Sequence, residues 1–544
     1  MNSTDDPIDI EAANGRGQAW KGAIAVVLIL YAALLTRDIA QPWVGLHDWN
    51  GAFYSQLARN LLRYPFEVHH GMPVVAVGLA PPSPEECSIY ATHPPGLAWL
   101  VAMSFRVFGE QEWSARLVPI VASLGALAIL ATAVRRRCGQ ATAVVFGVVF
   151  ALLPMTAYFG RMVDQEAPAL LCMAAGALAL DDLLAGRPRT ASRVGPGFVW
   201  AVCAAGAIFI DWSGVLFAGL AVIWATVQAA RRRCGIRAWA RITTPVIVAV
   251  CAMLAHLVYA GLNGRWADLY AIFLSRSGSE SVSANQSAAA GGAWAYTVDN
   301  LTWPVIVLAT TGLILRLLSK SETPRTFGGA EAGRSTAAAG HVILAITGVL
   351  WLGVFWRQYQ RHHYWLYYLA PLVAESAAVA AVAIARSVRR IMPRWAEGVV
   401  WAAGGVTVVF AILGVNRFYD RVALPIGEVQ AWRRVHERVV ERWKRRYPED
   451  EVTARVLLYR NPVRLETRGG YVLRNIVPPQ MAYYLDMPFD VESNLIRAAR
   501  DAGQYEGFLL SARDAIDHGG QLRAFREVYN EVPVGEWVLF EASR

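Results

Sequence analysis

Apolar runs of up to about 20 residues recur along the first 415 residues of the chain. A run of about 20 residues crosses the hydrocarbon core of a bilayer when it is helical. The pattern predicts eleven membrane spans, with an uncleaved first one. They lie at residues 21–35, 116–134, 141–159, 167–184, 197–211, 213–230, 242–260, 300–318, 341–356, 364–385 and 397–415.

Short basic clusters follow every second predicted span. They contain Arg135, Arg136 and Arg137; Arg187, Arg189 and Arg193; Arg231, Arg232, Arg233, Arg237 and Arg241; Arg316, Lys320, Arg325 and Arg334; and Arg386, Arg389, Arg390 and Arg394. Because Lys and Arg collect on the cytoplasmic side of short loops, the N-terminus is predicted to be cytoplasmic. Residues after about 415 are then periplasmic or extracellular, and we expect a multi-pass protein of the inner (plasma) membrane.

Two outer connections are long, at residues 37–115 and 261–299. In the first, Trp49, Phe53, Leu57 and Leu61 recur every four residues, which predicts an amphipathic helix. A second short apolar helix is predicted over residues 95–108. Both are too short or too broken to span, so we expect them to lie along the membrane surface.

The C-terminal part of the chain is polar and its pattern differs. An amphipathic helix is predicted at residues 427–446, strands at 456–459, 482–485, 508–511 and 537–540, and helices at 490–502 and 513–528. This alternation predicts a small extracytoplasmic α/β domain. The expected domains are a cytoplasmic tail at 1–20, a membrane domain at 21–415 that includes loop 37–115, and the soluble domain at 416–544.

Composition supports a membrane protein and excludes several other classes. Hydrophobic residues make up 55% of the chain and charged residues 17%, and the mean hydropathy is +0.33. These values exclude a disordered chain and an ordinary soluble domain. The net charge of +9 comes from the loop clusters, so it indicates topology and no nucleic-acid partner. Six cysteines without a CxxC spacing give no support for a zinc module.

Acidic residues gather on the predicted outer face. Asp48 opens the first amphipathic helix, and Asp164 and Glu166 precede the span that begins near Pro168. Each has an alternative reading as a helix cap or a dipole partner, because acidic residues favour helix N-termini. Their common face and depth favour a functional role. Glu375 lies within the tenth span and is a further candidate, with no partner identifiable from the sequence.

Cationic and aromatic residues also gather there. His93 precedes Pro94 and Pro95, and the segment from Arg357 to Tyr368 contains Arg361, His362, His363 and Tyr364. An interfacial belt explains the aromatic residues but does not explain arginines on the outer side. A bound phosphate group does. The outer histidines show no HxxxH or HExxH spacing, so surface histidines or histidines in contact with phosphate are favoured over a metal site.

Together these segments resemble the GT-C glycosyltransferases of the glycosyltransferase family 39 type, the branch that contains protein O-mannosyltransferases and the lipid A aminoarabinose transferase. The layout matches over roughly residues 20–415. The motifs are Asp48, the Pro-Pro turn with its helix to Phe108 followed by Arg116-Leu117-Val118-Pro119, Met162-Val163-Asp164, and Arg361 to Tyr364 leading into Tyr368-Leu369-Ala370-Pro371.

The resemblance implies an inverting transfer of a sugar from a polyprenyl-phosphate donor to a protein, lipid or glycan acceptor on the outer face. It implies that Asp48 is the general base and that Asp164 orients the acceptor or the sugar. The departing phosphate would be bound by His93, Arg361, His362 and Tyr364, and we assign Glu166 and Arg59 to the acceptor or sugar. We expect the C-terminal domain to help select the acceptor.

The chain departs from the family pattern at two positions. Family members often carry a second acidic residue beside the first, where this chain has His47-Asp48-Trp49. No cofactor is therefore certain, and a divalent cation stays open. His93 stands where some members have Lys, so a titratable group replaces a fixed charge.

Two other classes of function remain open. A lipid-linked-saccharide flippase or another transporter would also have many spans and the intramembrane Glu375. Transporters usually carry repeated halves and broken helices around a mid-membrane site, whereas the charged candidates here gather at the outer surface. A receptor-like scaffold would explain the external domain but not the outer carboxylates.

Overall fold

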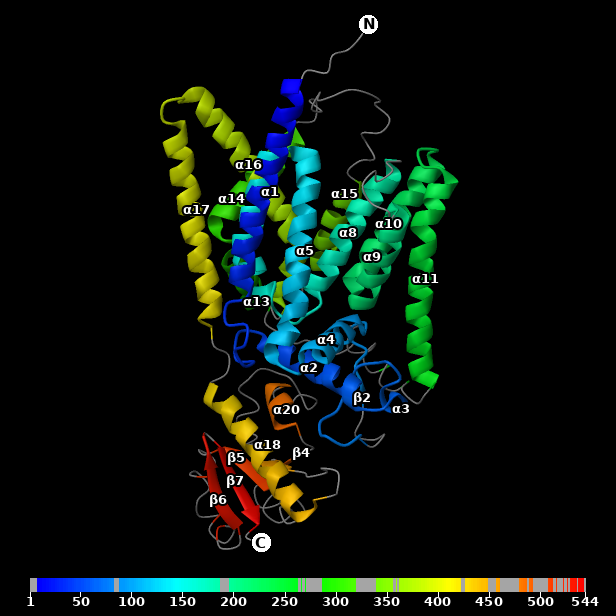
Figure 1. Ribbon diagram of the computed structural model, residues 1–544, viewed down its shortest axis with the longest axis vertical. Helices are drawn as coiled ribbons and strands as arrows, with labels where there is room; N and C mark the ends of the chain where they lie inside the picture. The colour runs from blue at the N-terminus through cyan, green and yellow to red at the C-terminus, as the bar shows by residue number, and fades with distance from the viewer. Residues whose placement is uncertain are drawn as a thin grey trace. The chain divides into compact units, whose positions relative to one another are not determined.

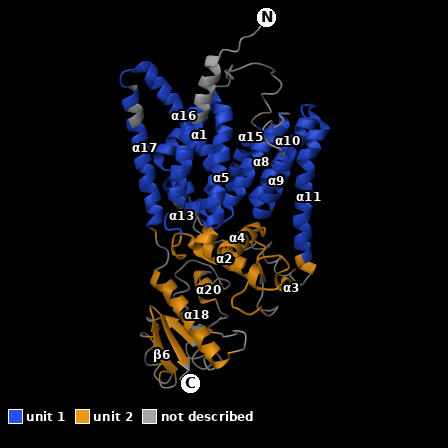
Figure 2. Cartoon of the chain, in the orientation of Figure 1, with its two compact units in different colours: residues 1–39, 117–259, 274–420 blue, residues 40–116, 260–273, 421–544 orange. Residues whose placement is uncertain are grey.

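The computed structural model describes most of the chain. The described residues are 7–82, 88–185, 195–262, 286–318, 339–355, 362–421, 426–448, 456–459, 479–486, 489–492, 507–511, 529–535 and 537–542, with residues 266, 270, 359, 515, 522 and 526. The chain forms two compact units (Figure 2). Unit 1 contains residues 1–39, 117–259 and 274–420, and unit 2 contains residues 40–116, 260–273 and 421–544.

Unit 1 is helical in its described part (Figure 1). Its elements are α1 (Pro7–Leu35), α5 (Glu112–Cys138, from residue 117), α6 (Gln140–Leu152), α7 (Pro154–Phe159), α8 (Glu166–Leu184), α9 (Pro196–Ile210), α10 (Trp212–Ala230), α11 (Ile236–Ala260), α13 (Gln286–Leu301), α14 (Trp303–Leu318), α15 (Ala339–Val354), the 3-10 helix η4 (His363–Leu369), α16 (Ala370–Ile391) and α17 (Ala396–Tyr419). Helices α8, α9 and α10 pack side by side.

Each of the eleven predicted apolar segments coincides with helix, but not all of them are single long spans. Among the described residues, six helices are long and apolar enough to cross a membrane, or seven if a bent pair counts as one span. That pair, Ala293–Leu301 and Trp303–Leu318, bends by 89°. The segment predicted at 141–159 is broken between α6 and α7, because Pro154 restricts the residue before it and cannot continue the helix ladder.

Small residues let the helices of unit 1 approach closely. A Cβ atom on Gly312 of α14 would lie 1.8 Å from the carbonyl oxygen of Ser376 in α16. A Cβ on Gly340 of α15 would lie 2.1 Å from the carbonyl oxygen of Ala177 in α8. Backbone contact of this kind is how helices pack tightly where lipid supplies no hydrophobic driving force between them.

Unit 2 combines the first long loop with the C-terminal part of the chain. Its elements are α2 (Asp48–Arg63), α3 (Phe66–His69), β1 (Val74–Val75), β2 (Ser88–Ile89), α4 (Gly96–Phe108), α18 (Ile426–Arg446), β3 (Val456–Tyr459), α20 (Pro479–Leu485), β4 (Phe489–Glu492), β5 (Gly507–Ser511), β6 (Tyr529–Val534) and β7 (Trp537–Ala542). The expected helices at 48–61 and 95–108 are thus confirmed as α2 and α4.

The C-terminal strands form a mixed five-stranded sheet in the order β4-β3-β5-β7-β6. Strand β3 pairs in parallel with β4 and β5, and β7 pairs antiparallel with β5 and β6. The predicted small α/β domain is confirmed in its secondary structure, including helix α18 and strands β3, β5 and β7.

Two details of this domain were predicted wrongly. Residues 482–485 belong to helix α20, because Pro479 suits a first helical turn and the run is too short for its period to distinguish helix from strand. Residues 490–492 lie in strand β4, so the helix predicted at 490–502 does not begin there. The rest of that helix, and most of the helix predicted at 513–528, lie outside the described residues.

Candidate functional site

The side chain of Asp48, in unit 2, is buried and has both a backbone and an arginine partner. The residue is 6% exposed, and its Oδ2 accepts a hydrogen bond from the backbone N–H of Gly45 at 2.9 Å. The guanidinium of Arg116 forms an ion pair with the same oxygen at 3.2 Å. Arg116 also donates to the carbonyl of Gln41 and stacks over the ring of Trp43, 4.1 Å from its centroid. The carboxylate is therefore held by a buried cation and by a backbone N–H group.

The local backbone sets this arrangement. His47 precedes α2 with φ at +60°, an uncommon conformation for a residue with a side chain, and makes no side-chain cap bond. Asp48 is the first helical residue, and its carboxylate turns back to the preceding loop at Gly45. Burial lowers the pKa of His47 to about 4, against the opposing effect of Asp48, so His47 is neutral beside the carboxylate at neutral pH.

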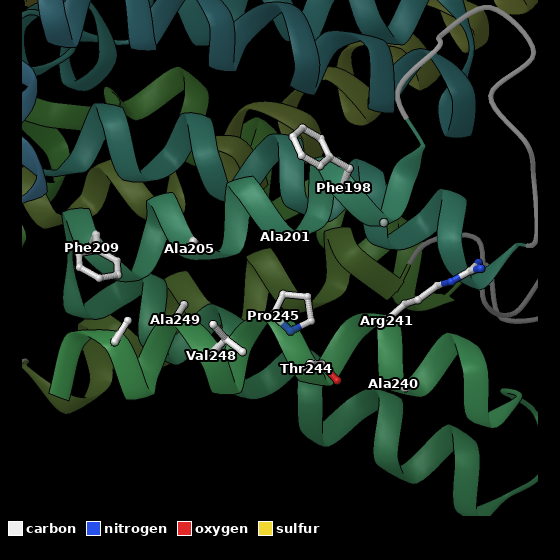
Figure 3. A pocket seen from close by; sticks show the side chains of 12 residues that line it. Phe198, Ala201, Ala205, Phe209, Ala240, Arg241, Thr244, Pro245, Val248 and Ala249 are labelled. Atoms are coloured by element: carbon white, nitrogen blue, oxygen red, sulfur yellow. The ribbon is translucent and has the colours of Figure 1, made fainter. Parts of the chain in front are cut away.

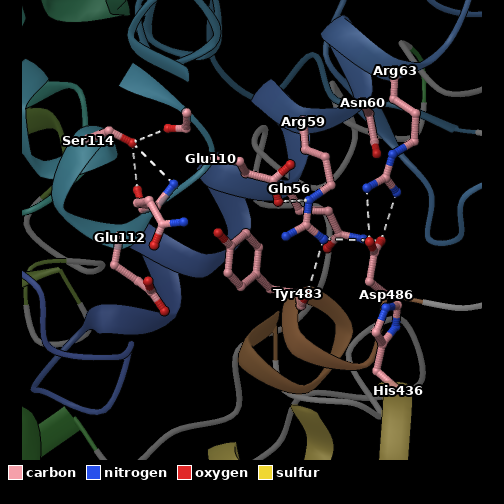
Figure 4. Close-up of polar contacts among 12 residues, drawn as sticks. Gln56, Arg59, Asn60, Arg63, Glu110, Glu112, Ser114, His436, Tyr483 and Asp486 are labelled. Atoms are coloured by element: carbon pink, nitrogen blue, oxygen red, sulfur yellow. Dashed lines mark hydrogen bonds and ion pairs between the residues drawn. The ribbon is translucent and has the colours of Figure 1, made fainter. Parts of the chain in front are cut away.

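The other two candidates in unit 2 have different surroundings. His93 is half-buried at the Pro-Pro turn before α4, and its ring stacks with Tyr90 at 6.3 Å. Arg59, 6% exposed, is held by Glu110 and, at 3.0 Å, by Asp486 (Figure 4). These contacts explain the burial of Arg59 without a ligand, and its assignment to the acceptor or sugar stays a prediction.

Unit 1 brings three other candidates together. The hydroxyl of Tyr364 bonds the carboxylate of Asp164 and lies 2.6 Å from Nδ1 of His362. His362 also stacks on Trp365, with ring centroids 4.8 Å apart. Ser123 of α5 bonds the carbonyl of Gly160 at 2.7 Å and the hydroxyl of Tyr367 at 2.8 Å, which ties η4 to the loop before α8. Arg361 lies outside the described residues.

Asp164 has unusual electrostatics. Burial raises the pKa of its carboxyl, and nearby Asp211 raises it further. Bonds from the Gln165 backbone and from Tyr364 oppose this rise, and the resulting pKa is about 8. A protonated Asp164 at neutral pH can donate a hydrogen bond as well as accept one, which suits a group that orients a sugar or an acceptor.

Glu166 and Asp211 lie near Asp164 and form with it a cluster of acidic residues in unit 1. Glu166 is 5% exposed, and its Oε2 has no hydrogen-bond partner among the described residues. Asp211 caps α10 through the N–H of Ser213 and accepts a 2.7 Å bond from the hydroxyl of Tyr368. The sequence pattern did not single out Asp211 as a candidate. A lone charged residue in an apolar stretch could have indicated it, because Asp211 is the only charged residue between Pro196 and Ala230.

A metal centre has limited support from this geometry. Acidic oxygens such as those of Asp164, Glu166 and Asp211 suit a hard divalent cation. In the described part of the chain, however, no group of three His, Cys, Asp or Glu side chains is arranged to hold a metal ion. We therefore derive no chemical step through a metal.

The chain is similar to known glycosyltransferases in part of its sequence and in its fold. Residues 92–259 match the profile of the dolichyl-phosphate-mannose-protein mannosyltransferase family. A comparison with curated protein sequences found no match. The structure of ArnT from Cupriavidus metallidurans bound to undecaprenyl phosphate is similar over 95% of this chain and 97% of that one, with a TM-score of 0.55 and 13% identity.

The oligosaccharyltransferase AglB from Archaeoglobus fulgidus, in complex with an inhibitory peptide and a dolichol-phosphate, is also similar in structure. It aligns over 96% of this chain and 74% of that one, with a TM-score of 0.51 and 10% identity. The chain has a GT-C glycosyltransferase fold. The predicted GT-C fold class is thereby confirmed, whereas the number of membrane spans, the membrane orientation and the roles of individual residues stay predictions.

Glu375 occupies a separate ionic cluster in unit 1. Arg137 of α5 contacts its carboxylate at 2.7 Å and Arg316 of α14 at 2.6 Å. His341 of α15 lies 3.5 Å from the same group. The partner that the sequence left unidentified is thus a set of three basic side chains from three helices. This cluster explains a buried carboxylate without a transport role.

An open groove of about 830 Å³ lies between α9 and α11, also in unit 1 (Figure 3). Phe198, Ala201 and Phe209 line one side, and Thr244 and Val248 line the other. The lining contains no carboxylate, so the groove offers no base for a group transfer. Its apolar surface is typical of helices that face lipid chains.

Proposed function

We propose that this protein is an inverting glycosyltransferase that moves a sugar from a polyprenyl-phosphate donor to a protein, lipid or glycan acceptor. We place the reaction on the outer face of the inner (plasma) membrane, with the N-terminus cytoplasmic and residues 416–544 periplasmic or extracellular. The observation that carries the proposal is the buried Asp48, held by Arg116 and by the Gly45 backbone, in a chain with the GT-C fold.

The proposed chemistry is a single displacement. A hydroxyl or amine of the acceptor attacks the anomeric carbon while Asp48 takes its proton, and the bond between that carbon and the phosphate oxygen breaks. The polyprenyl phosphate leaves with the bonding electrons, and the anomeric configuration inverts. A carboxylate already desolvated and oriented can act without first shedding a water shell.

The other candidates have roles around this step. We propose that Asp164 orients the acceptor or sugar, and that Glu166 and Arg59 each bind the acceptor or sugar. His93, Arg361, His362 and Tyr364 would bind the phosphate as its negative charge grows. The bond between Tyr364 and His362 supports a shared role for these two, because each fixes the orientation of the other.

Donor consumption by purified protein tests the proposal. A panel of radiolabelled polyprenyl-phosphate sugars is incubated with wild type and with Asp48→Asn, and turnover of each donor is measured. We expect one donor class to be consumed and Asp48→Asn to lower kcat by about 10²–10⁴-fold. Asp38→Asn is the matched control, because Asp38 is exposed and paired only with neighbouring Arg37 at 3.6 Å among the described residues. Equal turnover by wild type and Asp48→Asn would remove Asp48 from the mechanism.

A transporter is the second candidate, and one observation favours it. The 89° bend between the two parts of the helix pair at residues 293–318 is a feature of broken transporter helices. Counterflow of labelled lipid-linked saccharide in proteoliposomes separates the two functions. Transport without transfer of sugar to any acceptor would support the transporter.

A further inference from the structure

Helix α20 and Asp486, the residue that follows it, are fixed to helix α2 by partly buried ionic contacts, although more than 400 residues separate them in the sequence. Arg63 binds both carboxylate oxygens of Asp486, each at 2.9 Å (Figure 4). Arg59 contacts the same carboxylate and donates to the carbonyl oxygen of Tyr483, both at 3.0 Å. Bidentate, charge-assisted bonds of this type fix orientation as well as distance.

The charge of Asp486 is compensated in this setting. Burial alone would raise the pKa of Asp486, but Arg59 and Arg63 outweigh that effect and hold it below the ordinary value. The ring of Tyr483 lies 4.1 Å from the guanidinium of Arg59, which adds a cation–π contact. Helix α20 is therefore anchored on the helix that begins at Asp48.

A second contact from α20 leads directly toward Asp48. The hydroxyl of Tyr484 accepts a hydrogen bond from the backbone N–H of Trp43 at 2.8 Å and donates one to Glu112 at 2.8 Å. Glu112 is in turn bound by Arg433 of α18. A buried hydroxyl that both donates and accepts is fixed in place, and it fixes Trp43.

Trp43 joins this contact to the proposed base. Its ring lies under the guanidinium of Arg116, 4.1 Å from the charged carbon, and Arg116 binds Asp48. The ring also fills the space beside Gly51 of α2, where a Cβ atom would lie 2.2 Å from it. Tyr484, Trp43, Arg116 and Asp48 thus form one continuous chain of contacts in unit 2.

We propose that α20 is a positioning element for Asp48, and that Tyr484 acts through Trp43 and Arg116 to hold the Asp48 carboxylate in its working orientation. This inference rests on the proposed function of Asp48 as the base. It gives the C-terminal segment a part in the chemical step, beyond the acceptor selection expected from the sequence.

The variant Tyr484→Phe tests the proposal, because it removes one hydroxyl and keeps the ring that stacks with Arg433. We expect kcat to fall about tenfold and the KM for the polyprenyl-phosphate donor to stay within about twofold of wild type. Tyr447→Phe is the matched control. Tyr447 also belongs to the C-terminal segment, and its hydroxyl has no hydrogen bond among the described residues. A wild-type kcat in Tyr484→Phe overturns the proposal.

A double-mutant cycle separates positioning from a merely structural effect. If Tyr484 acts through Arg116, adding Tyr484→Phe to Arg116→Gln lowers kcat much less than the tenfold seen in the wild-type background. Independent effects multiply instead, and that outcome contradicts the proposed chain of contacts.

Amide hydrogen exchange gives a readout that does not need activity. Tyr484→Phe removes the acceptor of the Trp43 N–H, so exchange in peptides covering residues 41–48 should quicken about tenfold, and Tyr447→Phe should leave it unchanged. Unchanged exchange, or faster exchange with a wild-type kcat, refutes the role of α20. Failure of the wild type to consume any polyprenyl-phosphate sugar instead defeats the proposed function, while the exchange experiment still reports on the contact.

Discussion

At the scale of single residues, burial determines what the acidic candidates can do. Asp48 and Asp164 are both almost fully buried, but Asp48 has an arginine partner whereas Asp164 has another carboxyl group nearby. The first environment pairs the carboxyl group with a buried cation, and the second favours protonation of Asp164. Two carboxyl groups in such different surroundings suit two different roles, a base and a hydrogen-bonding group.

Asp164 predicts a specific dependence of stability on pH. The pKa of Asp164 is about 8 in the folded protein, against an ordinary value of 3.8. Protonation of Asp164 therefore contributes to the free energy of unfolding, and this contribution is complete below pH 3.8 and is lost as the pH rises through 8. Asp164→Asn has no proton to lose. We therefore expect its melting temperature, relative to wild type, to increase steadily from pH 5 to pH 8. The measurement is thermal unfolding of purified protein, and a difference that does not change with pH would contradict the electrostatics proposed for Asp164.

The sequence could predict these residues only in part. Asp48, Asp164 and Tyr364 were found because each lies in a short motif at the edge of an apolar run. The partners that give them their properties come from distant segments. Arg116 is 68 residues from Asp48 in the sequence, and no local sequence pattern predicts their contact.

At the scale of elements, apolar periodicity predicted helices well and their interruptions poorly. Every predicted span is helical, since long apolar runs leave few alternatives in a membrane. The break at Pro154 and the bend in the pair at 293–318 depend on packing as well as on local sequence. Short runs were least predictable: Ala482–Leu485 is apolar enough for a strand, yet it forms part of helix α20, which packs against α2.

Helix α2 supplies a test at this scale, at Gly51. Alanine favours helix by about 1 kcal/mol over glycine, but a Cβ at Gly51 would lie 2.2 Å from the ring of Trp43. Displacing that ring costs about 1–3 kcal/mol and disturbs the support of Arg116. We expect Gly51→Ala to lower both thermal stability and kcat. Gly22→Ala in α1 is the control, because a Cβ there meets nothing within 4 Å; equal effects of the two variants would argue against the packing role of Trp43.

At the scale of the whole molecule, the chain divides its charged residues between two settings. Unit 1 holds the Glu375 cluster and the acidic group around Asp164, and unit 2 holds the contacts that support Asp48. The sequence predicted the membrane class from composition and apolar runs, and the C-terminal domain from its polar composition and changed pattern. It did not predict that residues 40–116 form a compact unit with the C-terminal segment, because that grouping depends on ion pairs such as Arg63 with Asp486.

The Glu375 cluster joins α5, α14, α15 and α16, so it should matter for the stability of unit 1. Glu375→Gln leaves Arg137 and Arg316 without their shared anion, and we expect a loss of about 3 kcal/mol in stability. Glu397→Gln, on the exposed first turn of α17, should change nothing measurable. The measurement is the melting temperature of each of the two variants, compared with that of the wild type. An unchanged melting temperature in Glu375→Gln together with lost lipid transport would favour the transporter over the glycosyltransferase.

The central claim is that a polyprenyl-phosphate sugar is the donor and that its anomeric centre inverts. The most direct test follows release of polyprenyl phosphate and formation of the glycosylated acceptor in one reaction, with the anomeric configuration of donor and product read by NMR. The account predicts one polyprenyl phosphate released per sugar transferred, inverted configuration, and loss of both signals in Asp48→Asn. Retained configuration, or full product formation by Asp48→Asn, would contradict it.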